Sequence, residues 1–280
     1  MLSIAGFDPS SGAGITADIK TAAAFGCYAV TCITALTVQS TQGVFAVQPV
    51  QPEIARQTLE RLQQDFDIAA VRIGMLGSGS VAKEVADFLE RERLPNVVLD
   101  PVLRSSSGAD LIDSAGLEVL RERLLPLTDM ITPNIDEAAI LAKARPLSSD
   151  ATHEAAERTM REFAESLHRM GARGVAVTGG HLSEPMDYVS LAHPEGRQSK
   201  LLLSQHLTSR SSHGTGCAYA TAIACLLAMG GNPLTAATQA QCFVHDAIVN
   251  AYPLGRGTGP INHLFRWVEP PDDKPDTKTS

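Results

Sequence analysis

The 280-residue sequence lacks the signatures of several large protein classes. Its five cysteines are odd in number and show neither a C-x-x-C pair nor a Cys/His spacing suited to zinc, so no disulfide framework or zinc site is predicted. No stretch reaches the roughly 18 consecutive apolar residues of a membrane span, and the first residues do not resemble a secretory leader. We therefore expect a soluble, cytoplasmic protein without a membrane partner.

Positive charge is also scarce. The net charge is -8, the pI is near 5.5, and the Lys and Arg residues are scattered, so a nucleic-acid partner is not expected. Hydrophobic residues make up 44% and charged residues 19%, as in an ordinary globular protein. The composition predicts one domain over residues 1–268, followed by a polar, proline-rich and disordered tail over residues 269–280.

Short apolar runs alternate with longer amphipathic segments along the chain. Buried strands are expected at 2–7, 28–39, 70–76, 96–103, 130–134 and 174–180. Helices are expected at 15–26, 52–66, 80–94, 115–127, 135–144, 151–171 and after 214, with hairpin-like strands over 182–210. This order predicts an α/β fold with a mainly parallel central sheet and helices on both faces.

In such sheets the ligand binds beyond the carboxyl ends of the strands. The first of these ends carries "GAGITA", which fits the dinucleotide pattern G-x-G-x-x-A, but the next strand ends at Gln39 instead of a carboxylate that would hold a ribose. No P-loop motif is present. The glycine turn is better explained as a close backbone approach to a small polar ligand, with Asp18 one helical turn further on.

A second glycine-rich helix start, "HGTGC", spans residues 213–217. The N–H groups of Gly214 to Cys217 lie in the first turn, where they and the helix dipole favour an anion. The same groups should lower the pKa of Cys217, making it a nucleophile or a base. His213 also permits a Cys/His hydrolase, although no third residue that orients it is evident. The plain structural alternative is a tight turn that packs a small-residue helix into the core.

Two carboxylates follow strand ends. Asp100 lies in "VVLDPV", and Glu137 lies three residues beyond Asn134 in "TPNIDE". Carboxylates together with substrate phosphates suit Mg²⁺. The competing explanations are a helix or turn cap for Asp100 and an N-terminal capping box for Glu137.

Taken together, the motifs resemble a known family. The segment "SIAGFDPSSGAGITADIKTAAAFGCYAVTCITALTVQSTQG" is similar to the N-terminal signature of the hydroxymethylpyrimidine and phosphomethylpyrimidine kinases of thiamine synthesis. "IGML", "VVLDPV", "MITPNIDEAAIL", "GGH", "HGTGC" and "GTGPINH" follow in that family's order, so the resemblance covers residues 2 to about 265. It implies the ribokinase-like fold, a homodimer, and an ATP- and Mg²⁺-dependent kinase.

The resemblance also implies roles for individual residues. Cys217 would be the catalytic base, where most ribokinase-like enzymes have Asp, and the backbone of Gly214, Thr215 and Gly216 would form the anion hole. The pyrimidine would be held by Gly6, Asp18, Gln39, Met75 and Val102. Mg-ATP would be bound by Asn134, Glu137, Thr178, Gly180 and Arg210, with Asp100 and Glu137 as metal ligands.

The chain departs from the family pattern at two lysines. One is replaced by Ser106, with Arg104 two residues earlier, and the other by Thr178. Lysine loss near phosphates weakens the expectation that both the alcohol and its monophosphate are phosphorylated efficiently, although Arg104 or Arg210 could compensate. The alternatives are a pyridoxal kinase, a Cys/His hydrolase and a noncatalytic pyrimidine-binding protein.

Overall fold

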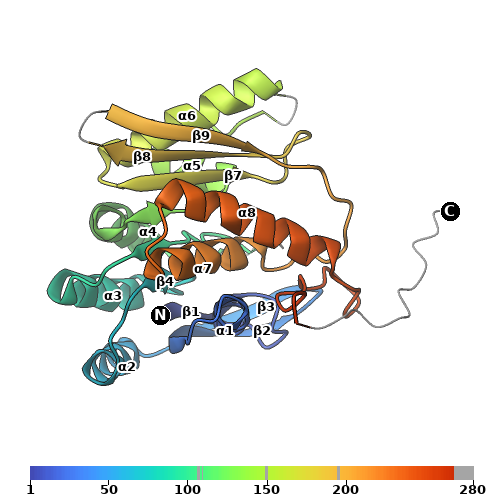
Figure 1. Ribbon diagram of the computed structural model, residues 1–280. Helices are drawn as coiled ribbons and strands as arrows, with labels where there is room; N and C mark the ends of the chain where they lie inside the picture. The colour runs from blue at the N-terminus through green and yellow to red at the C-terminus, as the bar shows by residue number, and fades with distance from the viewer. Residues whose placement is uncertain (106–107, 109, 149–150, 194–195, 268–280) are drawn as a thin grey trace.

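The computed structural model describes residues 1–105, 108, 110–148, 151–193 and 196–267 (Figure 1). Ser106 and the predicted polar tail, 269–280, lie outside these residues. None of the helices within the described residues combines the length and the apolar character needed to cross a membrane.

The described strands form one nine-stranded sheet in the order β3-β2-β1-β4-β5-β6-β7-β8-β9. Neighbours from β2 through β1 to β7 pair in parallel, while β3, β8 and β9 add antiparallel strands at the two edges. The prediction of a mainly parallel sheet is confirmed. The bounds are β1 Leu2–Phe7, β2 Val30–Ser40, β3 Gly43–Pro49, β4 Val71–Ile73, β5 Val97–Leu99, β6 Met130–Ile131, β7 Gly174–Gly179, β8 Met186–His193 and β9 Gly196–Leu203.

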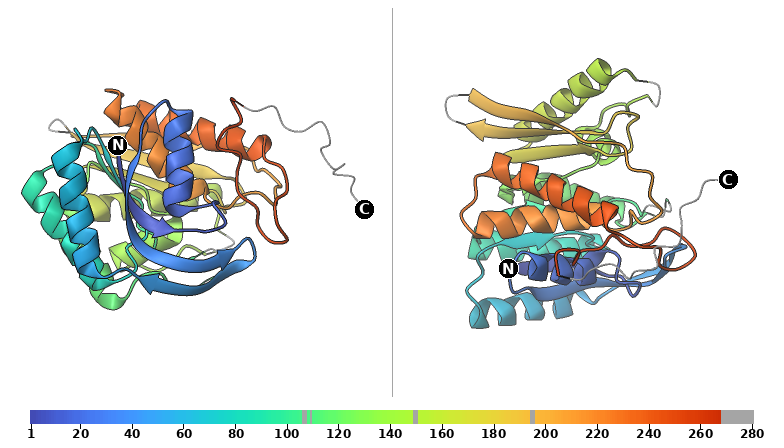
Figure 2. Two further views of the ribbon diagram at one scale, coloured as in Figure 1. Left: turned by 90° about the horizontal axis from the view of Figure 1, so that it is seen from below. Right: turned by 45° about the vertical axis from the view of Figure 1, so that its right-hand side comes forward.

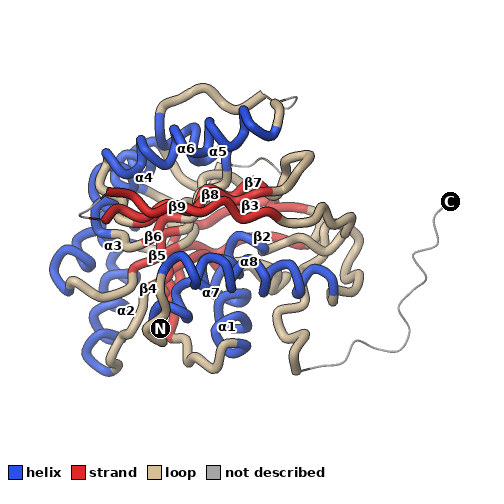
Figure 3. The backbone as a smooth tube through the Cα atoms, turned by 45° about the horizontal axis from the view of Figure 1, so that its top comes forward, coloured by secondary structure: helices blue, strands red, loops and turns tan. Residues whose placement is uncertain are grey.

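Helices cover both faces of the sheet, as predicted (Figures 2 and 3). One face carries α1 (Gly14–Ala24), α7 (Thr215–Ala228) and α8 (Pro233–Val249). The other carries α2 (Pro52–Asp65), α3 (Gly79–Glu92), α4 (Ser114–Val119), α5 (Ile135–Ala142) and α6 (His153–Arg169). The helix expected over 115–127 is interrupted: after α4 the chain continues as a π-helical turn, Leu120–Leu124, and a 3₁₀ turn, Leu125–Leu127, that contains Pro126.

Side chains of the central strands alternate between two cores. Val97 and Leu99 of β5 face the core under α2 to α6, while Val98 between them faces the core under α7 and α8. A strand buried on both faces reads as an unbroken apolar run, which is why these strands are visible in the sequence. The polar residues that follow the parallel strands are thereby collected at one edge of the sheet.

Candidate active site

Two glycine-rich turns from opposite ends of the sequence meet at this edge. Gly214, which precedes α7, has φ 86°, and a Cβ on it would lie 1.8 Å from the carbonyl oxygen of Gly12. A Cβ on Gly12 would lie 2.1 Å from Cδ2 of His213. Neither position has room for a side chain, and φ at Gly214 falls in the region that glycine adopts most readily. The two glycines let the "GAG" and "HGTGC" turns touch.

The residues around Gly259 hold the "HGTGC" turn from its other side. The Gly259 carbonyl accepts from the His213 N–H at 3.0 Å, and the Gly259 N–H donates to the Arg210 carbonyl at 2.8 Å. Thr258 N–H donates to the Thr41 carbonyl at 2.9 Å, which ties the same segment to the β2–β3 turn. The exposed Arg210 side chain donates to the Arg256 carbonyl at 3.4 Å, so Arg210 belongs to this segment.

A buried cluster of charges lies beneath the turns. Arg72 of β4 is fully buried and pairs through Nη1 with Asp18 at 3.1 Å and through Nη2 with Asp100 at 2.5 Å. Asp18 also accepts from the hydroxyls of Ser3, at 2.5 Å, and Thr221, at 2.8 Å. Burial raises the pKa of both carboxyls, and Arg72 opposes the rise. Asp18 therefore forms the floor under the site, with no exposed surface of its own.

Cys217 lies beside this cluster, and its predicted acidity is wrong. Burial raises the pKa of the thiol to about 11. Arg72 and the Gly14 N–H act to lower this pKa, whereas Asp100 and Asp18 raise it further. The helix terminus alone does not decide the matter, because burial outweighs it and two carboxylates, Asp18 of α1 and Asp100 after β5, lie nearby. At neutral pH Cys217 is a thiol.

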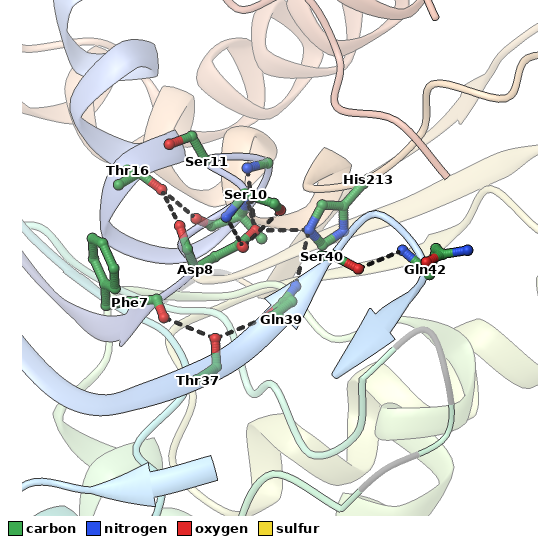
Figure 4. Close-up of polar contacts among 12 residues, drawn as sticks. Phe7, Asp8, Ser10, Ser11, Thr16, Thr37, Gln39, Ser40, Gln42 and His213 are labelled. Carbon is green, nitrogen blue, oxygen red and sulfur yellow. Dashed lines mark hydrogen bonds and ion pairs between the residues drawn. The ribbon is translucent and has the colours of Figure 1, made fainter. Parts of the chain in front are cut away.

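His213 points to a different set of partners. In the part of the chain that the structure describes, the side chain of His213 contacts Asp8 at 2.8 Å and Gln39 at 3.2 Å (Figure 4). Asp8 is the orienting residue that the sequence did not reveal. Because Cys217 sits instead with Arg72 and Asp100, the geometry does not favour a Cys/His hydrolase.

Three of the five residues expected around the pyrimidine, Gly6, Met75 and Val102, lie together on one wall. A Cβ on Gly6 would lie 2.9 Å from Sδ of Met75, so these two residues are in contact. Met75 belongs to a small apolar cluster with Ala35 and Leu111, against which Val102 packs. On the other side, Gln39 is held between His213 and Thr37 (Figure 4).

Four of the five residues expected around the nucleotide gather at the ends of β6 and β7, whereas Arg210 lies in the segment around Gly259. Asn134 and Glu137 form a complete capping box at the start of α5, and Asn134 bridges to Thr178. Gly180 follows, and a Cβ built on it would have open space. Burial, followed by the charge of Asp100, raises the pKa of Glu137 to about 8.

The capping box expected at Glu137 is confirmed, and the charge of Asp100 lies close enough to raise the pKa of Glu137. The role of Glu137 as a metal ligand stays a prediction. The structure contains no group of three or more His, Cys, Asp or Glu side chains that could hold a metal ion among the described residues. A cation at this edge would thus be held by the pair Asp100 and Glu137, together with oxygens from other sources.

Comparison with known proteins identifies the family of the chain. The family model described as phosphomethylpyrimidine kinase matches residues 8–262. The chain belongs to this family. A hydroxymethylpyrimidine/phosphomethylpyrimidine kinase of Escherichia coli is 37% identical over 268 residues, which cover 95% of this chain and 97% of that protein. A thiamine biosynthesis bifunctional protein of Geobacter sulfurreducens is 41% identical over 265 residues, but the chain spans only 52% of its length.

Solved structures give the same fold. A phosphomethylpyrimidine kinase from Clostridium difficile has a TM-score of 0.74 at 33% identity, covering 88% of this chain and 98% of that one. A pyridoxal kinase from Bacillus subtilis, solved as an ADP complex, has a TM-score of 0.82 at 30% identity, covering 94% and 96%. Family and neighbours together confirm the ribokinase-like fold expected from the motifs.

Proposed function

We propose that the chain is a phosphotransferase of thiamine biosynthesis that phosphorylates 4-amino-5-hydroxymethyl-2-methylpyrimidine, its monophosphate, or both. ATP is the phosphoryl donor and Mg²⁺ the cation. The observation that carries the proposal is the meeting of the two glycine turns directly over the Arg72, Asp100 and Cys217 cluster, in a chain of this family. The homodimer remains a prediction from the resemblance, and the cytoplasmic location remains a prediction from the apolar pattern of the sequence.

The chemistry follows from the N-terminus of α7. Phosphoryl transfer depends mainly on positioning and on stabilising spread negative charge. The first N–H groups of α7 have no partner within the helix and, with the helix dipole, would receive the charge of the transferred group. Gly216 leaves open space beside them, because nothing lies within 4 Å of a Cβ built there.

Cys217 meets the substrate hydroxyl in this proposal. Because its pKa is raised to about 11, the thiol has to lose its proton before it can act as a base. Arg72 and the Gly14 N–H stabilise the thiolate that forms. Arg72 is thus a positioning residue that acts through Cys217 and that the sequence analysis missed.

Two carboxylates would hold the cation. Asp100 and Glu137 are close enough for one charge to raise the pKa of the other, and a divalent cation would relieve that repulsion. When bound, Mg²⁺ would neutralise charge on the phosphates of ATP. The residues present therefore fit the cation that the family implies.

Release of ADP, measured separately with the aminopyrimidine alcohol and with its monophosphate, tests the function. No turnover with either compound would refute it. Turnover of a substrate in the absence of ATP would instead indicate a hydrolase. Binding of the aminopyrimidine without any release of ADP would indicate a noncatalytic binding protein. The monophosphate is the more informative substrate, because Thr178 replaces a family lysine, and Arg104 pairs at the surface with Asp110 at 2.9 Å.

Pyridoxal kinase activity is the second candidate, favoured by the TM-score of 0.82 with the Bacillus subtilis enzyme. Pyridoxal belongs in the same assay as a third substrate. A higher kcat/KM for pyridoxal than for either pyrimidine would replace the leading proposal with this one.

A further inference from the structure

A line of four polar contacts runs along the mouth of the site (Figure 4). Asp8 Oδ2 lies 2.8 Å from His213 Nε2, and the same His213 nitrogen lies 3.2 Å from Nε2 of Gln39. At the other end of the Gln39 amide, Oε1 lies 3.1 Å from the Thr37 hydroxyl, which also lies 2.9 Å from the carbonyl oxygen of Phe7. The two ends of the line fix the direction of the hydrogen bonds between them.

At the first end, Asp8 can only accept. Burial alone would raise its pKa, but hydrogen bonds from His213, Ser10 and Ala13 outweigh burial and lower the pKa to about 2. Its Oδ2 already accepts from the N–H groups of Gly12, at 3.1 Å, and Ala13, at 2.9 Å. An ionised carboxylate has no proton to give. His213 must therefore carry its proton on Nε2, whether the ring is neutral or charged.

At the second end, Thr37 has one hydroxyl proton, and the Phe7 carbonyl can only accept it. The hydroxyl is then free to accept from Gln39. With Nε2 of Gln39 toward His213, an amide N–H would face an imidazole N–H. A half-turn of the amide, which exchanges two groups of nearly equal size, removes this conflict and satisfies every link. The Gln39 oxygen then shares the Nε2 proton of His213 with Asp8 in a three-centre hydrogen bond, and its NH₂ group donates to Thr37.

We propose that Asp8 and His213 are positioning residues that fix the Gln39 amide in this orientation, and that the fixed amide selects a 4-aminopyrimidine edge over a 4-oxopyrimidine edge. This inference rests on the proposed function, in which the hydroxymethyl group at C5 faces Cys217 and so fixes the ring. Gln39 keeps one N–H and one oxygen lone pair for the ligand. An aminopyrimidine offers a ring-nitrogen acceptor beside an amino donor, whereas the oxo compound offers the reverse. To bind the oxo compound, the amide would have to turn its NH₂ group back against His213.

Binding measured by calorimetry tests the selection. We expect wild-type protein to bind the 4-amino compound roughly 100-fold more tightly than its 4-oxo analogue, because two hydrogen bonds are reversed. His213→Leu frees the amide and should reduce this ratio about tenfold. His213→Gln keeps a donor near the position of Nε2 and should restore most of the ratio. His245→Leu is the matched control, since His245 of α8 also lies beside an aspartate, at 3.4 Å from Asp246, but outside the site.

The ratio of the two affinities shows whether His213 orients the Gln39 amide or only stabilises the site around it. If His213 only stabilised the site, His213→Leu would weaken the binding of both compounds by the same factor. An unchanged ratio in His213→Leu would therefore overturn the proposal. A control variant whose ratio falls as far as that of His213→Leu would overturn it too.

Nuclear magnetic resonance of the ligand-free protein tests the hydrogen bonds directly. The chain has eight histidines, and the imidazole signals lost in His213→Gln identify His213. We expect a proton on its Nε2, and cross-relaxation between the Gln39 NH₂ protons and the Thr37 methyl group. An unprotonated Nε2, or NH₂ protons next to the imidazole instead, would overturn the proposal. If the aminopyrimidine failed to bind at all, the proposed function would fall, while these spectra would still decide the orientation of the amide.

Discussion

Replacing Glu137 by Gln separates the two roles that this residue has in the fold. Oε2 of Glu137 accepts from the Asn134 N–H at 3.0 Å, and Oε1 accepts from the Leu103 N–H at 3.3 Å. The bond to Asn134 is one of the two that make up the capping box at the start of α5. Gln is itself a capping-box residue, and its single oxygen can accept from the Asn134 N–H, while its NH₂ group takes the place of the oxygen that accepts from Leu103. The variant therefore keeps the cap, loses the Leu103 bond at every pH, and removes the charge that burial and Asp100 oppose.

The pKa of Glu137 sets the size of the effect. Raising it from 4.5 to about 8 corresponds to about 5 kcal/mol that ionisation costs the folded state. Below pH 4.5 Glu137 is protonated in the folded and the unfolded chain, so the folded protein has its full stability. As the pH rises from 4.5 to about 8 the unfolded chain ionises first, and the free energy of unfolding falls until the folded carboxyl ionises too. We expect the free energy of unfolding of wild type, relative to Glu137→Gln, to fall by about 3 to 5 kcal/mol between pH 5 and pH 8.5.

Urea unfolding without Mg²⁺ or nucleotide, repeated across this pH range, measures the difference. Asp136→Asn is the matched control, because Asp136 lies exposed on the same first turn of α5 and its charge is the smallest of the causes that raise the pKa of Glu137. The pH dependence of this variant should therefore stay close to that of wild type. Parallel curves for wild type and Glu137→Gln would refute the reasoning, since they would mean that Glu137 ionises as easily in the fold as in the unfolded chain.

Four further outcomes follow from the site. Cys217→Ser should keep the fold and lower kcat by a factor of roughly 10² to 10⁴, as expected for the loss of a general base. A kcat near that of wild type would mean that the thiol only fills space in the packing of the site. At pH 7.5 iodoacetamide should modify the exposed Cys242 before Cys217, and mass spectrometry of the first modified peptide checks this order. Arg72→Met leaves two buried carboxylates without their cation and should cost about 3 to 5 kcal/mol in urea unfolding, whereas a loss below about 1 kcal/mol would contradict the charge cluster. Gln39→Leu should weaken pyrimidine binding by about 1 to 3 kcal/mol in calorimetry, and wild-type affinity would place the ring elsewhere.

The sequence predicts the central part of the fold because burial on both faces leaves a readable apolar run. It does not predict β3, Gly43–Pro49, whose side chains are half-buried or exposed at the edge of the sheet. It also misses α8, because the residues that α8 buries are almost all alanines, which form no apolar stripe of large side chains.

Within the site, sequence motifs identify residues but not their charge states. Arg72 is one charged residue in a short apolar strand, and its partners lie 54 and 28 positions away. Asp8 and His213 are 205 positions apart. The pKa of Cys217 was predicted in the wrong direction because the local argument considers the helix terminus, and neither the burial of the thiol nor the carboxylates that the fold brings beside it.

The contact between the "GAG" and "HGTGC" turns also sets when the protein can first work during its synthesis. Asp8 precedes His213 by 205 residues, and His213 is itself held by a bridge to Pro260. A ribosome adding about 5 to 20 residues per second makes the first turn roughly 10 to 40 seconds before the second. Over that interval the proposed anion site has only one of its two walls. A nascent chain that has folded its first strands therefore still lacks His213 and the first turn of α7, and a chain released before Pro260 lacks the bridge that holds His213.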